Sequence, residues 1–283
     1  MSTALSNAAF ETLATLLKTR SGLAIGADKI YLLETRLSGL LKRDRLPNLN
    51  ALADRLRQPG SDALARDVVE AMTTNESFFF RDDKPFQHFR NQALARIVAG
   101  RPAGAPIRIW SAAASSGQEA YSLAMIIAES GAVLGGRKIE IIGTDIAREQ
   151  LARAKEGAYS QFEVQRGLPV QMLMRHFRQE NGRWRIADAI RNMVQFREYN
   201  LLADLRPLGR FDIVFCRNVL IYFDQPTKAR VLDNIASLMP PDGLLYLGGA
   251  ETVLGITDSF VPLPAERGVY GLARSAERLA VAV

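Results

Sequence analysis

Residues 107–119 read IRIWSAAASSGQE, and this stretch decides the class of fold. The apolar run from Ile107 to Trp110 is typical of a buried strand, and only small residues separate it from Gly117. Small residues let the backbone lie close to a ligand at the start of the helix that we expect to follow. The stretch therefore predicts the first strand and the ligand-binding loop of a nucleotide-type α/β domain.

Short apolar runs continue beyond this stretch and alternate with helical patterns. They cover residues 139–143, 194–196, 211–215 and 244–247. Such alternation predicts a doubly wound, Rossmann-like sheet with ligands at the carboxyl ends of its strands. Asn181-Gly182 is a strong hairpin signal, so we interpret residues 172–196 as a small antiparallel β insert in this domain.

The first part of the chain has a different pattern, because its apolar residues recur at helical spacing. Examples are Leu13 with Leu17 and Leu33 with Leu37. We therefore predict an all-α domain over residues 1–75. Residues 76–283 then form the larger domain, which includes the segment that connects the two.

Composition narrows the chemistry that this chain can perform. Of its 283 residues one is Cys and two are His, so an internal disulfide is impossible and a metal site is not expected. No stretch approaches the ~18–20 apolar residues of a membrane span, and no secretory signal is evident, so we expect a cytoplasmic protein without membrane insertion. The net charge of +6 favours an acidic partner.

Polar residues stand where a ligand site is expected, at the ends of the predicted strands. Glu119 repels phosphate but suits a ligand with an ammonium group, and the loop before it lacks the glycines of a dinucleotide site. Asp145 can accept hydrogen bonds from ribose hydroxyls, and Asn200 can meet an adenine edge. The alternatives are a helix-stabilising first-turn acid for Glu119, an N-cap for Asp145 and a turn-forming residue for Asn200.

Four motifs together resemble the CheR family of chemotaxis receptor methyltransferases. They are TTNESFFFR at residues 73–81, WSAAASSGQE at 110–119, GTDI at 143–146 and CRNVLIYFD at 216–224. The resemblance spans nearly the whole chain in the family's order. It implies an N-terminal helical domain, a domain that binds S-adenosylmethionine, and a small antiparallel insert.

The resemblance also implies residue roles by matching position. Arg81 and Tyr222 are expected nearest the transferred methyl group, although a buried aromatic is the alternative for Tyr222. Ser77 replaces the threonine that is common in the family, and Gln118 replaces a frequent acid. The residues expected to hold S-adenosylmethionine, or its product S-adenosylhomocysteine, are Asn75, Ser77, Arg81, Glu119, Asp145, Asn200, Leu201, Asn218 and Val219.

The expected reaction is methylation of glutamate side chains on the cytoplasmic domains of chemoreceptors. A glutamate with an ordinary pKa of ~4.3 is already an anion at neutral pH, so no general base is required. Basic residues between Arg36 and Arg57 are a candidate docking surface for an acidic receptor helix, with an ordinary solvated face as the alternative. Members of the family that dock on a tethering peptide at the receptor C-terminus carry a longer, glycine-rich loop in the insert. Here the stretch from Phe177 to Ile186 is short and contains Gly182 alone, so the resemblance implies a protein that does not depend on such a peptide.

Two other functions remain open from the sequence. A nucleic-acid methyltransferase fits the basic pI near 9.6 and the separate helical domain, but the chain lacks the interleaved aromatic and basic residues of a base-stacking platform. A non-catalytic sensor that binds S-adenosylmethionine or another nucleotide fits the cofactor site. Such a sensor would not need Arg81 and Tyr222, which are expected to lie beside the transferred methyl group. We therefore expect a protein partner and no nucleic acid.

Overall fold

The structure is a computed structural model that describes residues 4–264 and 266–275. Its contacts divide the chain into two units. Of these described residues, the helical unit contains 4–74 together with Tyr222–Thr227, and the sheet unit contains Asn75–Ile221, 228–264 and 266–275.

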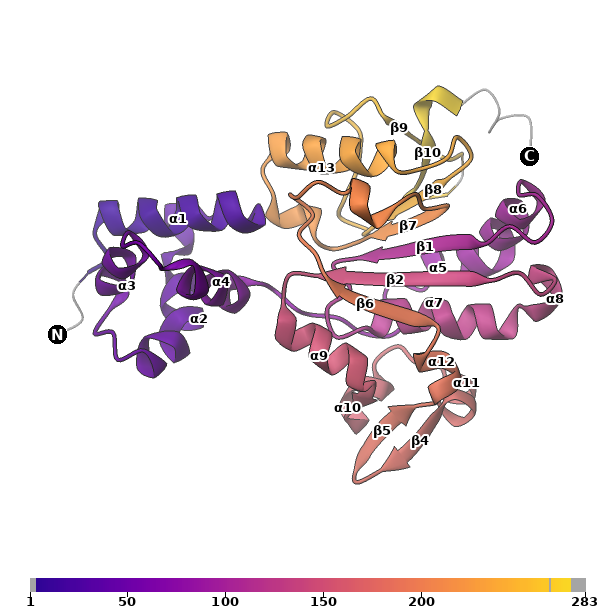
Figure 1. Cartoon of the computed structure of the whole chain (residues 1–283), viewed down its shortest axis with the longest axis horizontal. Coiled ribbons are helices and arrows are strands. Elements are labelled where there is room, and N and C mark those ends of the chain that lie inside the picture. Colours follow the sequence, from indigo (N-terminus) through magenta and orange to yellow (C-terminus); the bar gives the residue numbers. More distant parts are fainter. Residues whose placement is uncertain (1–3, 265, 276–283) are drawn as a thin grey trace. The chain divides into compact units, whose positions relative to one another are not determined.

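The helical unit contains α1 (Asn7–Ser21), η1 (Ala27–Lys29), α2 (Ile30–Arg43), α3 (Leu49–Leu56) and α4 (Asp62–Met72), drawn in indigo in Figure 1. Its core is formed by apolar side chains at helical spacing, including Leu13, Leu17, Leu33 and Leu37, which are fully buried. The predicted all-α domain is therefore confirmed.

A short return segment completes the helical unit. Lys18 of α1 forms an ion pair with Asp224 at 2.7 Å, and Leu23 forms an isolated antiparallel bridge with Phe223. Gly22 ends α1 at φ 79°, and a Cβ built on it would lie 2.9 Å from the Phe223 ring. Glycine is needed here both for the left-handed backbone and for this close approach.

The sheet unit is built on a seven-stranded sheet (Figure 1). Its strands are β1 (Ile107–Ala112), β2 (Ile139–Asp145), β6 (Val194–Glu198), β7 (Ile213–Cys216), β8 (Leu244–Leu247), β9 (Phe260–Pro262) and β10 (Val269–Leu272). They lie in the order β6-β2-β1-β7-β8-β10-β9; β10 is antiparallel to both β8 and β9, and the other neighbouring pairs are parallel. The chain order reverses at β1, between β2 and β7, which is where ligands bind in such sheets.

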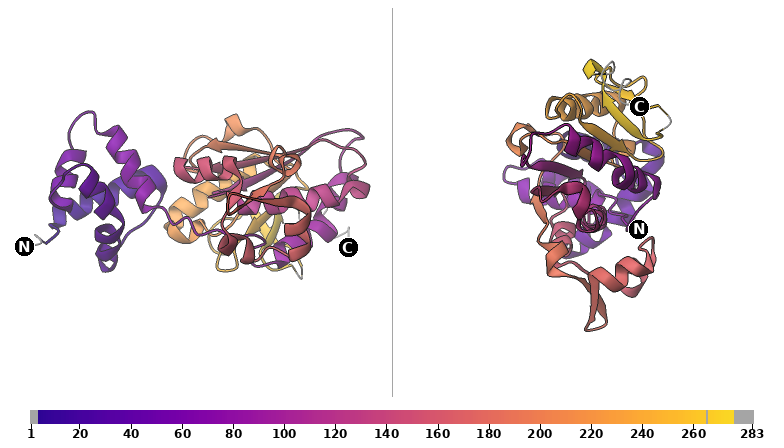
Figure 2. Two further views of the ribbon diagram at one scale, coloured as in Figure 1. Left: turned by 90° about the horizontal axis from the view of Figure 1, so that it is seen from below. Right: turned by 90° about the vertical axis from the view of Figure 1, so that its right-hand side faces the viewer.

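Helices lie on both faces of this sheet (Figure 2). They are α5 (Lys84–His88), the π-helical turn η2 (Phe89–Ala93), α6 (Leu94–Ala99), α7 (Gln118–Glu129), α8 (Gly131–Leu134), α9 (Arg148–Glu156) and α13 (Gln225–Ser237). Alternate strand residues such as Ile109, Phe215 and Tyr246 join one large core with Phe86 and Leu123. The predicted doubly wound, Rossmann-like fold is confirmed, and the short 3₁₀ turns η3 (Arg206–Leu208), η4 (Leu220–Tyr222) and η5 (Ala273–Ser275) complete the elements.

A small antiparallel sheet is inserted between β2 and β6. It contains β3 (Ala158–Tyr159), β4 (Phe177–Glu180) and β5 (Arg183–Ile186), with α10 (Gln161–Gln165), α11 (Val170–His176) and α12 (Asp188–Arg191) around it. The expected hairpin is present, and Asn181 and Gly182 both have positive φ, as a tight primed turn requires. The third strand, β3, is only two residues long and was not predicted.

Candidate active site

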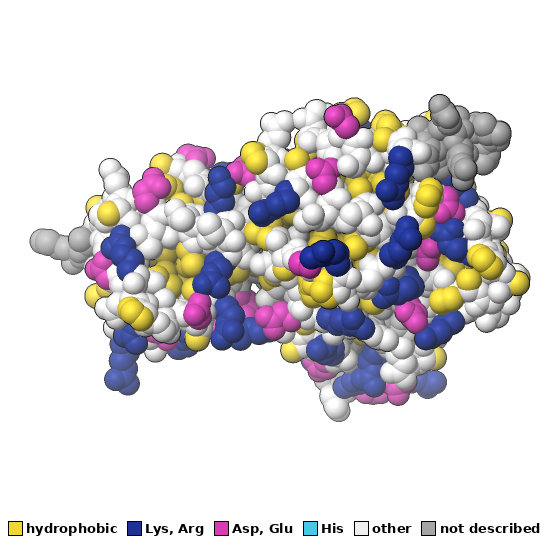
Figure 3. Space-filling view, turned by 45° about the horizontal axis from the view of Figure 1, so that its top comes forward, with side chains coloured by type: hydrophobic (Ala, Val, Ile, Leu, Met, Phe, Trp, Pro, Cys, Tyr) yellow, Lys and Arg dark blue, Asp and Glu magenta, His cyan; other side chains and the backbone are white. Residues whose placement is uncertain are grey.

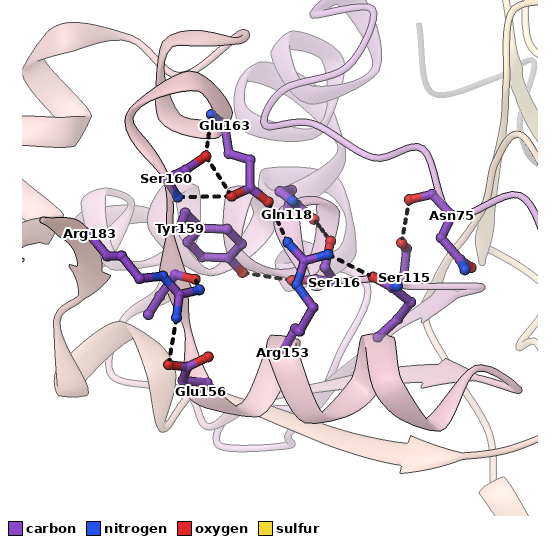
Figure 4. A network of polar contacts seen from close by, with 12 residues as sticks. Asn75, Ser115, Ser116, Gln118, Arg153, Glu156, Tyr159, Ser160, Glu163 and Arg183 are labelled. Carbon is purple, nitrogen blue, oxygen red and sulfur yellow. Dashed lines mark hydrogen bonds and ion pairs between the residues drawn. The ribbon is translucent and has the colours of Figure 1, made fainter. Parts of the chain in front are cut away.

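The loop after β1 has an unusual backbone. Ala113, Ser115 and Gly117 have φ values of 59°, 50° and 94°, so two residues with side chains lie in the left-handed region. Such strain persists only where the surroundings hold it. The Ser115 amide donates to Asp145 Oδ2 at 2.8 Å, and the Tyr159 hydroxyl donates to the Ser116 carbonyl at 2.8 Å (Figure 4). The loop is thus fixed from β2 and from the insert.

Asp145 ends β2 and is oriented by backbone amides. Its Oδ2 accepts from Ser115 and its Oδ1 accepts from the Ala147 amide at 2.9 Å. The N-cap of α9 is Ala147, so Asp145 does not occupy that position. A buried carboxylate with a fixed orientation therefore lies beside the loop after β1.

Glu119 lies in the first turn of α7 and is held by two partners. Its Oε1 accepts from the Ser111 hydroxyl at 2.8 Å, and its Oε2 pairs with Arg217 Nη1 at 3.2 Å. Burial raises the pKa of the Glu119 carboxyl, while Arg217 and Ser111 oppose that shift. The Glu119 carboxylate therefore belongs to a buried ionic network, unlike a first-turn acid that is exposed to solvent.

Arg217 is the centre of that network, although no role was predicted for it. Its side chain is 1% exposed, and Nη2 donates to the Arg81 carbonyl at 2.8 Å and to Asp82 Oδ2 at 2.6 Å. One guanidinium therefore connects the end of β7, the start of α7 and the segment that contains Arg81. The available signal was a charged residue directly after the buried strand β7.

Asn218 and Val219 follow Arg217 in a loop that is closed by another residue the sequence analysis missed. Glu251, which is 9% exposed, accepts from the amides of Asn218, Val219, Leu220 and Gly248 at 2.7–2.9 Å. Asn218 has φ 59°, a conformation that Asn tolerates better than most residues. Glu251 follows the apolar strand β8, so the strand-end rule that selected Asp145 could have found it.

Asn200 and Leu201 follow β6. The Asn200 Oδ1 accepts from the Leu202 amide at 2.9 Å, and its carbonyl accepts from Ala203, so Asn200 does form a turn. Leu201 is buried. The Tyr199 amide donates to the Asp145 carbonyl at 2.9 Å, which connects this turn to the end of β2.

The segment Asn75–Asp83 is attached to the same loops. The Ser115 hydroxyl donates to the Asn75 carbonyl at 2.9 Å (Figure 4), and the Phe80 amide donates to the Ser122 hydroxyl at 3.0 Å. Ser77 is half-buried in this segment. Phe80, Asp82 and Asp83 have positive φ, so this segment is a second place where the backbone is strained.

Arg81 differs from the other charged residues at the site. Its Nη1 donates to the Glu76 carbonyl at 3.0 Å, and its guanidinium carbon lies 5.2 Å from the centre of the Phe78 ring. Within the described residues it has no carboxylate at ion-pair distance. Arg81 therefore presents a positive charge that the surrounding residues leave uncompensated.

Tyr222 belongs to the helical unit rather than to this group. It is half-buried, and its carbonyl accepts from the Ala24 amide at 3.0 Å. The other predicted residues all belong to the sheet unit. Asp145 ends β2, Glu119 lies in the first turn of α7, and the rest lie on loops that follow strands or lead into α5, namely Asn75, Ser77, Arg81, Asn200, Leu201, Asn218 and Val219.

Residues 4–264 and 266–275, which the structure describes, contain no group of three or more His, Cys, Asp or Glu residues that could hold a metal ion. None of the described helices is long and apolar enough to cross a membrane. Cys216 is buried, and the imidazole of His88 bonds the hydroxyl of Tyr246 at 2.8 Å.

The parallel sheet, its strained loop after β1 and the fixed carboxylate after β2 define a domain of the nucleotide-binding α/β class. Residues 75–269 match the family model of the CheR methyltransferase SAM binding domain, and residues 8–73 match that of the CheR methyltransferase all-alpha domain. The chain belongs to the CheR methyltransferase family, which confirms the resemblance of its four motifs.

Curated relatives match along most of the chain. The chemotaxis protein methyltransferase Cher2 of Pseudomonas putida is 39% identical over 267 residues, covering 93% of this chain and 97% of that protein. The chemotaxis protein methyltransferase 1 of Pseudomonas aeruginosa has the same identity and coverage. The chemotaxis protein methyltransferase of Vibrio anguillarum is 38% identical, covering 89% of this chain and 92% of that protein.

Proposed function

We propose that the chain is a protein-glutamate O-methyltransferase that uses S-adenosylmethionine to methylate chemoreceptors. Its family and the names of its relatives support chemotactic methyl transfer. The observation that carries the glutamate specificity is the uncompensated guanidinium of Arg81, because an anionic acceptor is the group that it would attract.

The residues at the strand ends fit the cofactor. Asp145 would accept from the ribose hydroxyls, and the buried Glu119 would face the ammonium of the amino-acid part. Asn200 and Leu201 would meet the adenine. The remaining walls of the cofactor site would be lined by Asn75, Ser77, Arg81, Asn218 and Val219. When bound, S-adenosylmethionine supplies an electrophilic methyl group.

The protein's own contribution is the placement of the acceptor. A glutamate carboxylate is ionised at neutral pH, so no residue has to remove a proton. Arg81 would hold one carboxylate oxygen and leave the other free to react. Orientation of this kind can lower a barrier by ~7–11 kcal/mol in favourable cases.

The helical unit would bind the acidic receptor helix through basic side chains. Arg36 donates to the Met72 carbonyl at 2.6 Å, and Arg43 pairs with Asp44 and Asp67, so these two guanidinium groups are already engaged. The face in Figure 3 carries basic side chains, in dark blue, over much of its surface, with acidic ones, in magenta, among them. The docking proposal therefore rests on exposed cations of the Arg36–Arg57 region that form no ion pair with another described residue, namely Lys42, Arg45 and Arg55.

The insert supports a docking mode without a tether peptide. Its hairpin strands β4 and β5 have four residues each, and they are joined directly at Asn181-Gly182. A hairpin this short offers few unpaired backbone groups for an added peptide strand. Because its substrate would be the cytoplasmic part of a receptor, we place the enzyme in the cytoplasm.

The test is methyl transfer from radiolabelled S-adenosylmethionine to a receptor cytoplasmic fragment, with RNA as a parallel substrate. We expect label on the receptor fragment alone, and its loss in Arg81→Ala but not in the matched control Arg178→Ala. Arg178 is an exposed arginine of β4 without an ion pair in the described chain. Label on RNA alone would support the nucleic-acid alternative, and cofactor binding without transfer would support a sensor.

A further inference from the structure

The insert contributes an arginine to the segment that contains Arg81. Arg166 directly follows α10, and its guanidinium carbon lies 4.3 Å from the centre of the Phe78 ring. Arg81 contacts the same ring from 5.2 Å. Two guanidinium groups from distant parts of the sequence therefore share one aromatic side chain.

Glu76 connects these two arginines through different atoms. Its backbone carbonyl accepts from Arg81 Nη1 at 3.0 Å, and its carboxylate pairs with Arg166 Nη2 at 2.5 Å. The pairing with Arg166 lowers the pKa of the Glu76 carboxyl, and the charge of Arg81 adds a smaller contribution in the same direction. The carboxylate thus lies within the electrostatic reach of Arg81 but is bonded to Arg166.

The backbone beside Arg166 fits closely against the same segment. Gly167 has φ 84°, and a Cβ built there would collide with the carbonyl oxygen of Phe79. Only glycine permits this approach, so the insert is seated directly on the residues before Arg81. The position of Arg166 is consequently set by the backbone and not only by its long side chain.

The charge arrangement has a consequence for the acceptor. A carboxylate five residues before Arg81, left without a partner, would compete with an incoming glutamate for the Arg81 guanidinium. It would also repel that glutamate, since both are anions. With Arg166 present, the charge of Glu76 is compensated and the charge of Arg81 remains available.

We propose that Arg166 is a positioning residue that holds the Glu76 carboxylate away from Arg81 and so keeps Arg81 free to bind the acceptor glutamate. The inference rests on the proposed function, because it assumes a carboxylate acceptor. In this proposal the insert contributes to binding of the acceptor glutamate at the active site. Arg166 would act through Glu76 and Phe78 rather than on the reacting atoms.

The test is a pair of substitutions examined with a receptor cytoplasmic fragment as substrate. Arg166→Ala frees Glu76 to bind Arg81, so we expect the KM for the receptor fragment to rise ~5–30-fold with little change in the dissociation constant of S-adenosylhomocysteine. Adding Glu76→Gln removes the competing charge, so the double variant should return to within ~3-fold of the unaltered enzyme. Glu76→Gln alone should leave KM unchanged or slightly lower.

Rescue by the second substitution distinguishes this role from a purely structural one. A double variant as impaired as Arg166→Ala, or a parallel loss of S-adenosylhomocysteine binding in Arg166→Ala, would overturn the proposal. Arg166→Gln gives a second, less disruptive variant with the same expectation, and Arg178→Ala is the matched control. Failure of the proposed function would differ, because the unaltered enzyme would then not methylate the receptor fragment.

Discussion

The charged groups of the candidate site differ between the side proposed to hold the cofactor, called the cofactor side, and the side proposed to hold the acceptor, called the acceptor side. Asp145, Glu119 and Glu251 are buried carboxylates whose oxygens accept from amides, a hydroxyl or a guanidinium of the chain itself. Arg81, in contrast, has one backbone carbonyl as a partner and no carboxylate among the described residues. On the cofactor side, residues of the chain itself therefore supply partners for the carboxylates before any ligand binds. On the acceptor side, the Arg81 guanidinium can pair with a carboxylate of the substrate.

The largest effect is expected when the positive charge of Arg81 is removed. In Arg81→Ala, methyl transfer to a receptor fragment should fall ~10²–10³-fold, because the acceptor carboxylate loses its orienting partner. The dissociation constant of S-adenosylhomocysteine, measured by titration calorimetry, should change less than ~5-fold. An equal loss of binding and transfer would mean that Arg81 belongs to the cofactor side.

A weaker but still large effect is expected when the cofactor side is disturbed at Glu251. In Glu251→Gln an amide group replaces an oxygen that faces backbone N–H donors, so the loop of Asn218 and Val219 loses its closure. Binding of S-adenosylhomocysteine should weaken ~10–100-fold, and the free energy of unfolding should fall by ~2–3 kcal/mol. Unchanged binding with lowered stability would restrict Glu251 to a role in folding.

The role of Glu119 on the cofactor side can be tested through the pH dependence of S-adenosylhomocysteine binding. Its raised pKa means that the unliganded protein holds a proton on this carboxyl above the ordinary value of 4.5, whereas a bound ammonium favours the ionised form. The affinity for S-adenosylhomocysteine should therefore increase as the pH rises above the ordinary value of 4.5. Glu119→Gln should abolish this dependence and weaken binding ~10-fold; a parallel pH profile in both proteins would contradict the assignment.

The smallest expected effect concerns the docking surface. Charge reversal at Lys42, Arg45 and Arg55 should raise the KM for the receptor fragment ~3–10-fold at low salt and have little effect at high salt, because exposed charges are screened. Reversal at Glu11 and Glu34, which are exposed acids of α1 and α2, is the control and should not raise KM. An equal response in both sets would argue against this surface.

The sequence predicted more of the fold than of the contacts within the site. Periodicity identified the helical domain and five of the sheet's strands, and Asn181-Gly182 located the hairpin, because these signals are local. The strands β3 and β9 have only two and three residues, and Gly271 interrupts the four residues of β10, so none of them shows the continuous apolar run that marks β7 and β8. Local signals of this kind are too weak in short strands.

The site shows the same limit. Glu119 and Asp145 could be selected because each follows a strand or opens a helix, and the structure gives each of them partners at its predicted location. Arg217 and Glu119 are 98 residues apart, and Arg166 and Glu76 are 90 apart. Such long-range pairs form only when the strands and the insert assemble, and the periodicity of the sequence carries no information on that assembly.

The most direct measurement is to locate the methyl group on the receptor fragment by mass spectrometry of its peptides before and after mild alkali. We expect the mass of one methyl group on glutamate residues, its release as methanol by alkali, and its absence when those glutamates are replaced by alanine. A methyl group that resists alkali, or that resides on another residue type, would contradict glutamate O-methylation by this protein.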